Sequence, residues 1–459
     1  MYQIDFHNPI QIYFIGIGGI SMSGLAEILL TEGFKVSGSD RAPSDLTRTL
    51  EERGVKVFYG QRSENLTAEI DLVVYTAAIK GDNPELLAAK NLGIPTLTRA
   101  ELLGQMMKNY KTPIAVSGTH GKTTTTSMIS QILLNADADP TLSIGGIYKP
   151  VGGNIRVGAS DIFVTEACEY TNSFLNFFPK IGIILNIEED HLDFFRDLSD
   201  IRHSFRRFAE LLPTDGALII NGDISSPEEL TKDLPCRVIT YGLQAGHDYS
   251  ASQIAYDESG FPSFTLTGNE GRNRKFSLHV HGDHNIQNAL AAIALADLLH
   301  IPDEIIAAGL LAFGGTDRRF EYKGQMNGVN IIDDYAHHPT EIRATLNAAA
   351  QYPHRRLWCV FQPHTYTRTK AFLEEFAKAL SLADEIVLAD IYAAREKDTL
   401  GISSQTLQEK IRSLGHSCHY FPSFEAIENF LSKNCTKDDL LITMGAGDVV
   451  KIGETLLQK

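Results

Sequence analysis

The chain has 459 residues, 43% of them hydrophobic, and a formal net charge of −16 at pH 7. A single hydrophobic core stops growing well below this length, so we expect two or three domains. The acidic balance argues against broad binding to nucleic acid or to an anionic membrane, because both need a basic face on the protein.

Cysteine usage and hydropathy bear on the cellular location. The five cysteines have no C-x-x-C spacing, which fits reduced thiols in a cytosolic enzyme and argues against a zinc site. The first twelve residues are polar and lack the pattern of a signal peptide. No segment approaches the ~20 uninterrupted apolar residues of a membrane span. We therefore expect a cytoplasmic protein without membrane insertion.

The first block alternates strands and helices. Its pattern predicts a strand at 12–15, a turn at 16–19, a helix at 22–30, and strands at 35–38, 56–59 and 71–75. This alternation indicates a parallel sheet with helices on both faces.

A glycine-rich turn joins the first strand to the first helix. The turn reads Gly16-Ile-Gly18-Gly19-Ile-Ser21, and Asp40 follows the next strand, which matches a dinucleotide-binding fingerprint except that serine holds the third glycine position. The turn favours binding of a nucleotide diphosphate. Tight helix packing alone and a nicotinamide-dependent dehydrogenase both remain open as alternatives.

The second block begins with a phosphate-binding pattern. Apolar periodicity lapses at 108–113, which suits a domain boundary, and an apolar run at 114–116 then leads into Gly118-Thr119-His120-Gly121-Lys122-Thr123-Thr124. Compared with the common G-x-x-x-x-G-K-[ST] spacing, the first glycine is displaced from the position of Val116 to Gly118.

The chemistry of this loop suits ATP. Lys122 would reach the β and γ phosphates, the Thr123 hydroxyl would bind Mg²⁺, and Gly121 would let the backbone approach closely. A helix start capped by threonine is the simpler alternative, but the preceding strand, the two glycines and the lysine together favour an ATP site.

Acidic residues and a histidine follow two later strands of this block, at 161–164 and 181–185. Glu166 and Glu169 follow the first, and Asp190, His191 and Asp193 follow the second. Ligands of open parallel sheets bind beyond the carboxyl ends of the strands, and carboxylate and imidazole groups there could hold Mg²⁺ against a phosphate. For Glu166 and His191 we favour metal binding over helix capping.

The block continues with a β-rich insertion at about 237–280 and a helix at 285–299. Asn285 and Asn288 are three residues apart and share one face of that helix. Asparagine amides both donate and accept hydrogen bonds, which suits an adenine edge, but N-terminal capping would give the same pattern.

The third block again alternates strands and helices. We expect strands at 329–332, 357–361, 385–388 and 440–443, and helices at 340–351 and 369–382. Polar residues gather at 317–321, 333–339 and 362–368. Arginine forks in these segments favour recognition of a carboxylate or a phosphate over plain surface charge. The pattern as a whole predicts three α/β domains.

Taken together, motifs along the whole chain resemble those of the Mur ligases, the enzymes that build the peptide of bacterial peptidoglycan. The motifs are Gly16-Ile-Gly-Gly-Ile-Ser-Met-Ser-Gly24-Leu-Ala, Gly118-Thr-His-Gly-Lys-Thr-Thr124, Asp190-His-Leu-Asp193, His284-Asn-Ile-Gln-Asn288, Arg318-Arg-Phe320, Asp333-Asp-Tyr-Ala-His-His-Pro-Thr-Glu341 and Gln362-Pro-His364. The resemblance implies a Rossmann-like UDP-sugar domain at 1–110, a central P-loop ATPase domain at 111–315, and a Rossmann-like amino-acid domain at 316–459.

The resemblance also implies a reaction. ATP would phosphorylate the lactyl carboxylate of UDP-N-acetylmuramate, and L-alanine would attack the acyl phosphate, giving ADP and phosphate in peptidoglycan precursor synthesis. Two anions must meet in the first step, so Lys122 and a Mg²⁺ ion on Thr123, Glu166 and His191 would neutralise charge. The protein would work as a monomer or homodimer.

Further roles are carried over from the family residue by residue. UDP-sugar binding is implied for Gly16, Gly18, Gly19 and Asp40; ATP binding for Gly118, Thr119, His120, Gly121, Lys122, Thr123, Thr124, Asn285, Asn288, Arg319 and Asp334; and amino-acid binding for His364 and Arg368.

The sequence departs from the family pattern at two points. Many members place arginine directly after the Gln-Pro-His triplet, whereas this chain has Thr365, so recognition of the alanine carboxylate would depend more on Arg368. Several related ligases use a carbamylated lysine some fifteen residues past the metal-binding histidine. This chain has no lysine between Lys180 and Lys232, so we predict no carbamylated ligand.

Two other enzymes and a binding protein remain as alternatives. A murein-tripeptide recycling ligase shares the fold, but its first loop usually departs from Gly-Ile-Gly-Gly. The dehydrogenase is supported only by that loop. A non-catalytic precursor-binding protein would have no need of Lys122, Thr123, Glu166 and His191 together.

Overall fold

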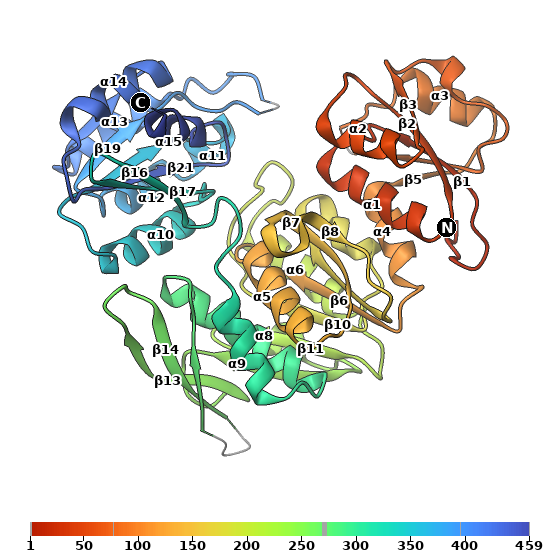
Figure 1. Cartoon of the computed structure of the whole chain (residues 1–459), viewed down its shortest axis with the longest axis horizontal. Coiled ribbons are helices and arrows are strands. Elements are labelled where there is room, and N and C mark those ends of the chain that lie inside the picture. Colours follow the sequence, from red (N-terminus) through yellow and green to blue (C-terminus); the bar gives the residue numbers. More distant parts are fainter. Residues whose placement is uncertain (1, 77, 269–272, 395, 459) are drawn as a thin grey trace. The chain divides into compact units, whose positions relative to one another are not determined.

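The computed structural model describes residues 2–76, 78–268, 273–394 and 396–458, and contains three β-sheets with helices between the strands (Figure 1). The prediction of a three-domain α/β protein is confirmed. By packing, the chain divides into two compact units: Met1–Ile187, Arg202–Ile220 and Ile224–Ile239 form the first, and Glu188–Ile201, Asn221–Asp223 and Thr240–Lys459 form the second. The expected central domain contributes residues to both units.

The first sheet is parallel, with strand order β3-β2-β1-β4-β5. Its strands are β1 (Gln11–Ile15), β2 (Lys35–Asp40), β3 (Lys56–Tyr59), β4 (Leu72–Tyr75) and β5 (Thr96–Thr98). Its helices are α1 (Ile20–Thr31), α2 (Asp45–Glu52), η1 (Ser63–Asn65), α3 (Pro84–Asn91) and α4 (Arg99–Met107). The strand order reverses at β1, where open sheets of this type bind ligands, and the glycine-rich turn follows β1.

The second sheet has ten strands in the order β15-β14-β13-β12-β11-β10-β6-β9-β7-β8. They are β6 (Thr112–Ser117), β7 (Thr141–Tyr148), β8 (Gly153–Arg156), β9 (Ile162–Ala167), β10 (Ile181–Ile184), β11 (Ala217–Asn221), β12 (Arg237–Gly242), β13 (Tyr249–Tyr256), β14 (Pro262–Thr267) and β15 (Arg274–Ser277). β6 pairs in parallel with β9 and β10, so the phosphate-binding loop leaves the carboxyl edge between them. The last four strands confirm the expected β-rich insertion.

Two helices of this region, α5 and α8, have long buried faces. The helices of the region are α5 (Lys122–Asn135), η2 (Lys149–Val151), η3 (Tyr170–Asn176), α6 (Leu198–Ala209), α7 (Glu228–Thr231), α8 (Asp283–Leu298) and α9 (Asp303–Ala312). From Asn285 to Ala296, α8 is buried at every position except Gln287, as its alanine-rich, almost uniformly apolar sequence predicts.

The third sheet has the order β16-β17-β21-β18-β19-β20, and only its edge strand β16 is antiparallel. Its strands are β16 (Glu321–Met326), β17 (Val329–Asp334), β18 (Leu357–Phe361), β19 (Glu385–Leu388), β20 (Cys418–Tyr420) and β21 (Leu440–Met444), and its helices are α10 (Pro339–Gln351), α11 (Tyr366–Ala371), α12 (Leu373–Leu380), α13 (Ser404–Ser413), α14 (Phe424–Asn434) and α15 (Val450–Leu457).

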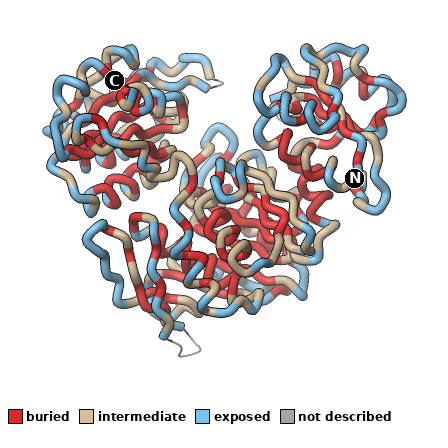
Figure 2. The backbone as a smooth tube through the Cα atoms, in the orientation of Figure 1, coloured by how far each residue is buried: buried red, intermediate tan, exposed pale blue. Residues whose placement is uncertain are grey.

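Strand alternation gives this sheet two cores, one on each face. Ile332, Cys359 and Ile386 pack against α10, α12 and α13 on one face, and Trp358 and Val387 pack against α14 and α15 on the other. Figure 2 shows buried residues running along the strands of all three sheets.

One helix prediction is wrong. The single helix expected at 369–382 is two shorter helices, α11 and α12, separated at Phe372 with φ −113° and ψ 28°. The aromatic ring of Phe372 turns toward the core under α10 and α12, and Thr365 starts α11 earlier than the apolar pattern indicated. Among the described helices, none is long and apolar enough to cross a membrane.

Candidate functional site

The phosphate-binding loop has a backbone that requires glycine at two positions. Gly118 has φ +143°, and a Cβ there would lie 2.9 Å from Cβ of Leu185. Gly121 has φ +83° and is the N-cap of α5, without a side-chain cap. The first amides of α5 therefore remain available to an anion at the positive end of the helix.

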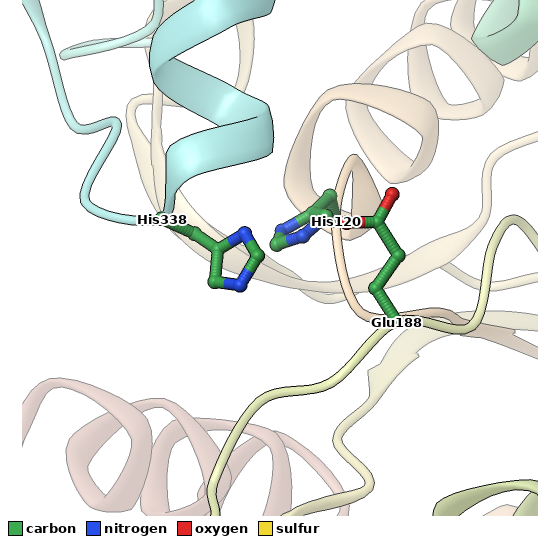
Figure 3. Close-up of side chains that lie close together, drawn as sticks. All are labelled: His120, Glu188 and His338. Atoms are coloured by element: carbon green, nitrogen blue, oxygen red, sulfur yellow. The ribbon is translucent and has the colours of Figure 1, made fainter. Parts of the chain in front are cut away.

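Asn186 clamps this loop from the end of β10. Its Oδ1 accepts from the amide of His120 at 2.7 Å, its Nδ2 donates to the carbonyl of His120 at 3.0 Å, and its own carbonyl accepts from the amide of Thr119 at 3.1 Å. Figure 3 shows His120 on the loop before α5. Asn186 was not singled out from the sequence, where its only signal was a polar residue directly after the strand next to β6.

We expect Asn186→Ala to weaken ADP or ATP binding by about tenfold, because two side-chain hydrogen bonds that hold the loop are lost. Calorimetric titration with ADP measures this change. Asn135→Ala, at the other end of α5, is the matched control and should leave the affinity unchanged. Equal ADP affinities for the Asn186 variant and the wild type would show that the loop holds its shape without the clamp.

Lys122 is held over the loop as a cation. Its Nζ donates to the carbonyls of Gly118 and, at 3.0 Å, of Thr119, and lies 3.0 Å from Oε2 of Glu169. Burial opposes the charge, but the carboxylate of Glu169 outweighs it and the pKa of Lys122 is raised. Lys122 is therefore charged and preorganised for a phosphate.

Two of the three expected metal ligands lie together. Oγ1 of Thr123 donates to Oε2 of Glu166 at 3.1 Å, and Oε1 of Glu166 accepts from the amide of Gly145 at 2.5 Å. A hydroxyl and a carboxylate side by side are the hard oxygen ligands that Mg²⁺ prefers, so these residues fit that ion. His191 belongs to the second unit, has φ +53°, and donates its amide to Oδ1 of Asp190 at 2.7 Å.

Amides of the glycine-rich turn after β1 are already hydrogen-bonded to neighbouring residues of the first domain. The amides of Gly16 and Ile17 donate to the carbonyl of Ser39, and the amide of Gly18 donates to Oδ2 of Asp40 at 2.8 Å. The donors left for a diphosphate are those of the first turn of α1, which lack intrahelical acceptors. Arg99 lies beside them, with its Nη1 3.2 Å from Oγ of Ser21, and was not singled out from the sequence.

Asn285 and Asn288 do not cap α8, because the N-cap is Gly282. Both are buried: Nδ2 of Asn285 donates to the carbonyl of His281 at 2.7 Å, and Nδ2 of Asn288 donates to Oδ1 of Asn285 at 3.0 Å. The capping alternative is therefore wrong, and the adenine role remains a prediction.

The neighbouring residues Arg318 and Arg319 make different contacts, and only Arg319 is a candidate ligand for ATP. Nε of Arg318 donates to the buried Asp333 at 2.9 Å and its Nη2 donates to the carbonyl of Gly445, so Arg318 holds the sheet edge. Arg319 has a long contact of 3.9 Å to Glu341. Burial raises the pKa of Asp334 to about 6 against the opposing charge of Arg319.

Arg368 and His364 lie together in the second unit. Nη2 and Nε of Arg368 donate to Oδ1 of Asp190 at 2.8 and 3.2 Å, and Nη1 lies 3.2 Å from Nδ1 of His364. Both charged side chains are about nine-tenths buried. Burial would raise the pKa of Asp190, but Arg368 overrides it and holds that pKa well below its usual range. Asp190, noted from the sequence as a polar residue after a strand, is the partner of Arg368.

Thr365 has a structural role in place of the family arginine. It is the N-cap of α11 at φ +66°, and its Oγ1 accepts from the amide of Arg368 at 3.4 Å. A β-branched residue at positive φ is uncommon. Thr365 thus orients the helix that carries Arg368.

The segment at Glu188 is tied to the start of α10 within the second unit. Oγ1 of Thr340 donates to Oε2 of Glu188 at 2.5 Å, and Nε2 of His338 lies 3.0 Å from the carbonyl of Glu189. Figure 3 shows His338 at the start of α10 and Glu188 on its own loop. These contacts brace the loop that carries Asp190 and His191.

Three family models match the chain in order. They are described as Mur ligase family, catalytic domain, at residues 11–111; Mur ligase middle domain, at 116–296; and Mur ligase, glutamate ligase domain, at 318–447.

Curated relatives and solved structures agree with these models. UDP-N-acetylmuramate–L-alanine ligases from Agathobacter rectalis and Lachnospira eligens are 62% and 61% identical to this chain, covering 100% of both chains. The crystal structure of UDP-N-acetylmuramate-alanine ligase from Thermotoga maritima matches with a TM-score of 0.81 at 29% identity, and a murein peptide ligase from Psychrobacter arcticus with 0.72 at 26%, each over 98% of both chains. On its sequence, its three sheets and its phosphate-binding loop, the chain belongs to the Mur ligase family.

Proposed function

We propose that this protein joins L-alanine to the lactyl carboxylate of UDP-N-acetylmuramate at the expense of ATP, releasing ADP and phosphate, in peptidoglycan precursor synthesis. The observation that carries the proposal is the 62% identity, over the whole chain, to a relative named for this reaction. The cation of Lys122 on the phosphate-binding loop supplies the chemistry that such a reaction needs.

The first step transfers the γ-phosphoryl group of ATP to the lactyl carboxylate. Lys122 and the first amides of α5 neutralise the phosphates as the two anions approach. Thr123, Glu166 and His191 would hold a Mg²⁺ ion, which when bound neutralises further phosphate charge. Asn285, Asn288, Arg319 and Asp334 are proposed to contact ATP outside the loop.

The nucleotide sugar is assigned to the first domain, at 1–110. Its diphosphate would lie against the turn of Gly16, Gly18 and Gly19, where Asp40 accepts a hydrogen bond from the amide of Gly18. Because the amides of the turn are already hydrogen-bonded, the backbone amides in the first turn of α1 would make most of the hydrogen bonds to the diphosphate. The central and C-terminal domains are assigned to 111–315 and 316–459.

The amino acid is assigned to the group around Arg368. The guanidinium is a two-point ligand for a carboxylate, and His364 supports it from Nδ1. Asp190 already compensates the buried charge of Arg368, so the site is stable before alanine binds.

One observation favours a second candidate function, the reaction of a murein peptide ligase. The match to a murein peptide ligase covers the same 98% of this chain, although at lower identity than the alanine ligases. A ligase of that kind from Neisseria is named for joining L-alanyl-γ-D-glutamyl-meso-diaminopimelate to UDP-N-acetylmuramate. The sugar would be the same in both reactions, so the choice between this tripeptide and L-alanine separates the two.

We expect release of ADP and phosphate only when ATP, UDP-N-acetylmuramate, L-alanine and Mg²⁺ are all present. A coupled ADP-release assay across L-alanine, L-serine, glycine and murein tripeptide measures this requirement, and omission of each component is the internal control. ADP release that depends on tripeptide, or that ignores the amino acid, would contradict the proposal. Removing Mg²⁺ with a chelator should stop turnover.

A further inference from the structure

The ring of His337 is fixed in one tautomer. His337 lies between β17 and α10, and its Nδ1 is 3.0 Å from the carbonyl oxygen of Tyr335 and 3.3 Å from Oε2 of Glu341. Both neighbours are acceptors, so Nδ1 must carry the proton and donate it. The other nitrogen, Nε2, then carries the lone pair of the neutral ring.

The ring that carries this lone pair lies beside the proposed amino-acid site. The ring of His337 meets the ring of His364 edge to face, with 5.7 Å between centroids, and His364 contacts Arg368. No residue within the described ranges makes a hydrogen bond to Nε2 of His337, whose side chain is 20% exposed. A base must have such an accessible acceptor within reach of the substrate proton.

His364 is excluded from the same role by its own contacts. A guanidinium has donors only, so Nδ1 of His364 accepts from Arg368 and its lone pair is used. In the neutral ring the proton is then on Nε2. Burial and the charge of Arg368 lower the pKa of His364 to about 4, so the ring stays neutral.

Charges from several elements face His337. Glu341 on α10 and Asp190 on the 188–201 segment favour its protonated form, while Arg368 on α11 opposes it. Burial is the largest influence, and it lowers the pKa of His337 to about 4. The ring is therefore neutral at neutral pH, and Glu341, which favours the protonated form, is placed to stabilise the imidazolium once a proton is transferred.

We propose that Nε2 of His337 is the general base that takes a proton from the ammonium group of the amino acid before it attacks the acyl phosphate. This inference rests on the proposed ligase function and on the amino-acid site around Arg368. It assigns a role to an imidazole that neither the phosphate site nor the metal site uses.

The ammonium group gives one proton to Nε2, and the freed lone pair forms the C–N bond at the acyl carbon while the carbonyl π pair moves to oxygen. As that pair returns, the C–O bond to phosphate breaks and phosphate leaves with its electrons, taking the second nitrogen proton. The imidazolium then releases its proton to water.

The test compares two nucleophiles. Alanine must lose a proton before it can attack, whereas hydroxylamine is already unprotonated at neutral pH and converts the acyl phosphate to a hydroxamate. With His337→Ala we expect alanine-dependent turnover to fall by about 100-fold or more, and hydroxamate formation to stay within about threefold of the wild type. The KM for alanine should change little, because Arg368 is intact.

Two further variants distinguish loss of the base from a general structural effect of the substitution. His337→Gln keeps a donor for the carbonyl of Tyr335 but has no basic nitrogen, so it should behave like His337→Ala. His354→Ala is the matched control, because His354 makes the same Nδ1 contact to a carbonyl, that of Tyr352, outside this group. Unchanged ADP affinity in each variant shows that it is folded.

A pH profile gives a second readout. Without the base, alanine-dependent kcat should keep rising with pH as hydroxide takes over, whereas the wild type reaches a plateau once His337 is unprotonated. Equal losses with both nucleophiles, or full alanine turnover in His337→Gln, would overturn the inference. No alanine-dependent ADP release from the wild type would instead refute the proposed function itself.

Discussion

Replacing Lys122 with alanine is expected to lower ligation by about a thousandfold or more, while affinity for UDP-N-acetylmuramate stays within a few fold. The reason is that Lys122 is a charged donor already placed on the phosphate-binding loop by Glu169 and by two loop carbonyls. Its loss leaves developing phosphoryl charge uncompensated, but it touches no part of the glycine-rich turn that is assigned to the nucleotide sugar.

Steady-state ADP release and calorimetric titration with UDP-N-acetylmuramate measure the two effects separately. Lys111→Ala is the control, since Lys111 precedes the same strand but makes only an exposed ion pair with Asp161. Loss of sugar binding in the Lys122 variant would contradict the division of labour between the first two domains. Near-normal turnover would remove Lys122 from the catalytic site.

Replacing Asp439 with alanine is expected to lower the unfolding free energy of the C-terminal domain by about 2–3 kcal/mol. The carboxylate is fully buried and accepts from Nε1 of Trp358 at 3.1 Å, Nε of Arg355 at 3.0 Å and the amide of Thr436 at 2.9 Å. Removing it strands a buried indole donor and leaves arginine charges without their partner at the start of the central strands β18 and β21.

Denaturant unfolding followed by the fluorescence of the single tryptophan reports on this domain directly. Asp439→Asn keeps one hydrogen-bond acceptor and should lower the unfolding free energy by less than Asp439→Ala does. Asp448→Ala removes only an exposed ion pair with Lys451 and should cost under about 1 kcal/mol. An alanine variant as stable as the wild type would mean that the arginines find other partners.

We also expect the contribution of Asp439 to the stability of the C-terminal domain to depend on pH. Burial opposes ionisation of Asp439, but the bonds from Thr436 and Trp358 and the charge of Arg356 outweigh it and lower its pKa. A lowered pKa contributes stability above the ordinary aspartate range, and this contribution is lost as the pH falls toward the folded-state value. The difference in unfolding free energy between the wild type and Asp439→Ala should therefore become smaller as the pH is lowered.

Secondary structure and local geometry were largely predictable. The strands at 56–59, 357–361 and 385–388 have the expected bounds, because short apolar runs between turn residues are strong local signals. The helix at 369–382 was predicted wrongly because its break at Phe372 is made by tertiary packing, while its residues individually favour helix.

Side-chain partners were much less predictable. Glu166 was expected beside Thr123, and the structure has them 3.1 Å apart, since Glu166 lies near the carboxyl end of β9 and Thr123 follows the neighbouring strand β6. Nothing local indicated that Asn186 would hold His120, or that Asp190 would face Arg368, 178 residues away. Such pairs depend on strand order, which the sequence pattern leaves open.

The sequence by itself determined the three α/β domains, the phosphate-binding loop with its cation, and the motifs of the family, because each of these depends on residues close together in the chain. Only the tertiary structure decided which carboxylate holds Lys122, which one holds Arg368, and which nitrogen of His337 carries the proton. These depend on acceptors that folding brings within about 3 Å, and a hydrogen bond forms only at that range.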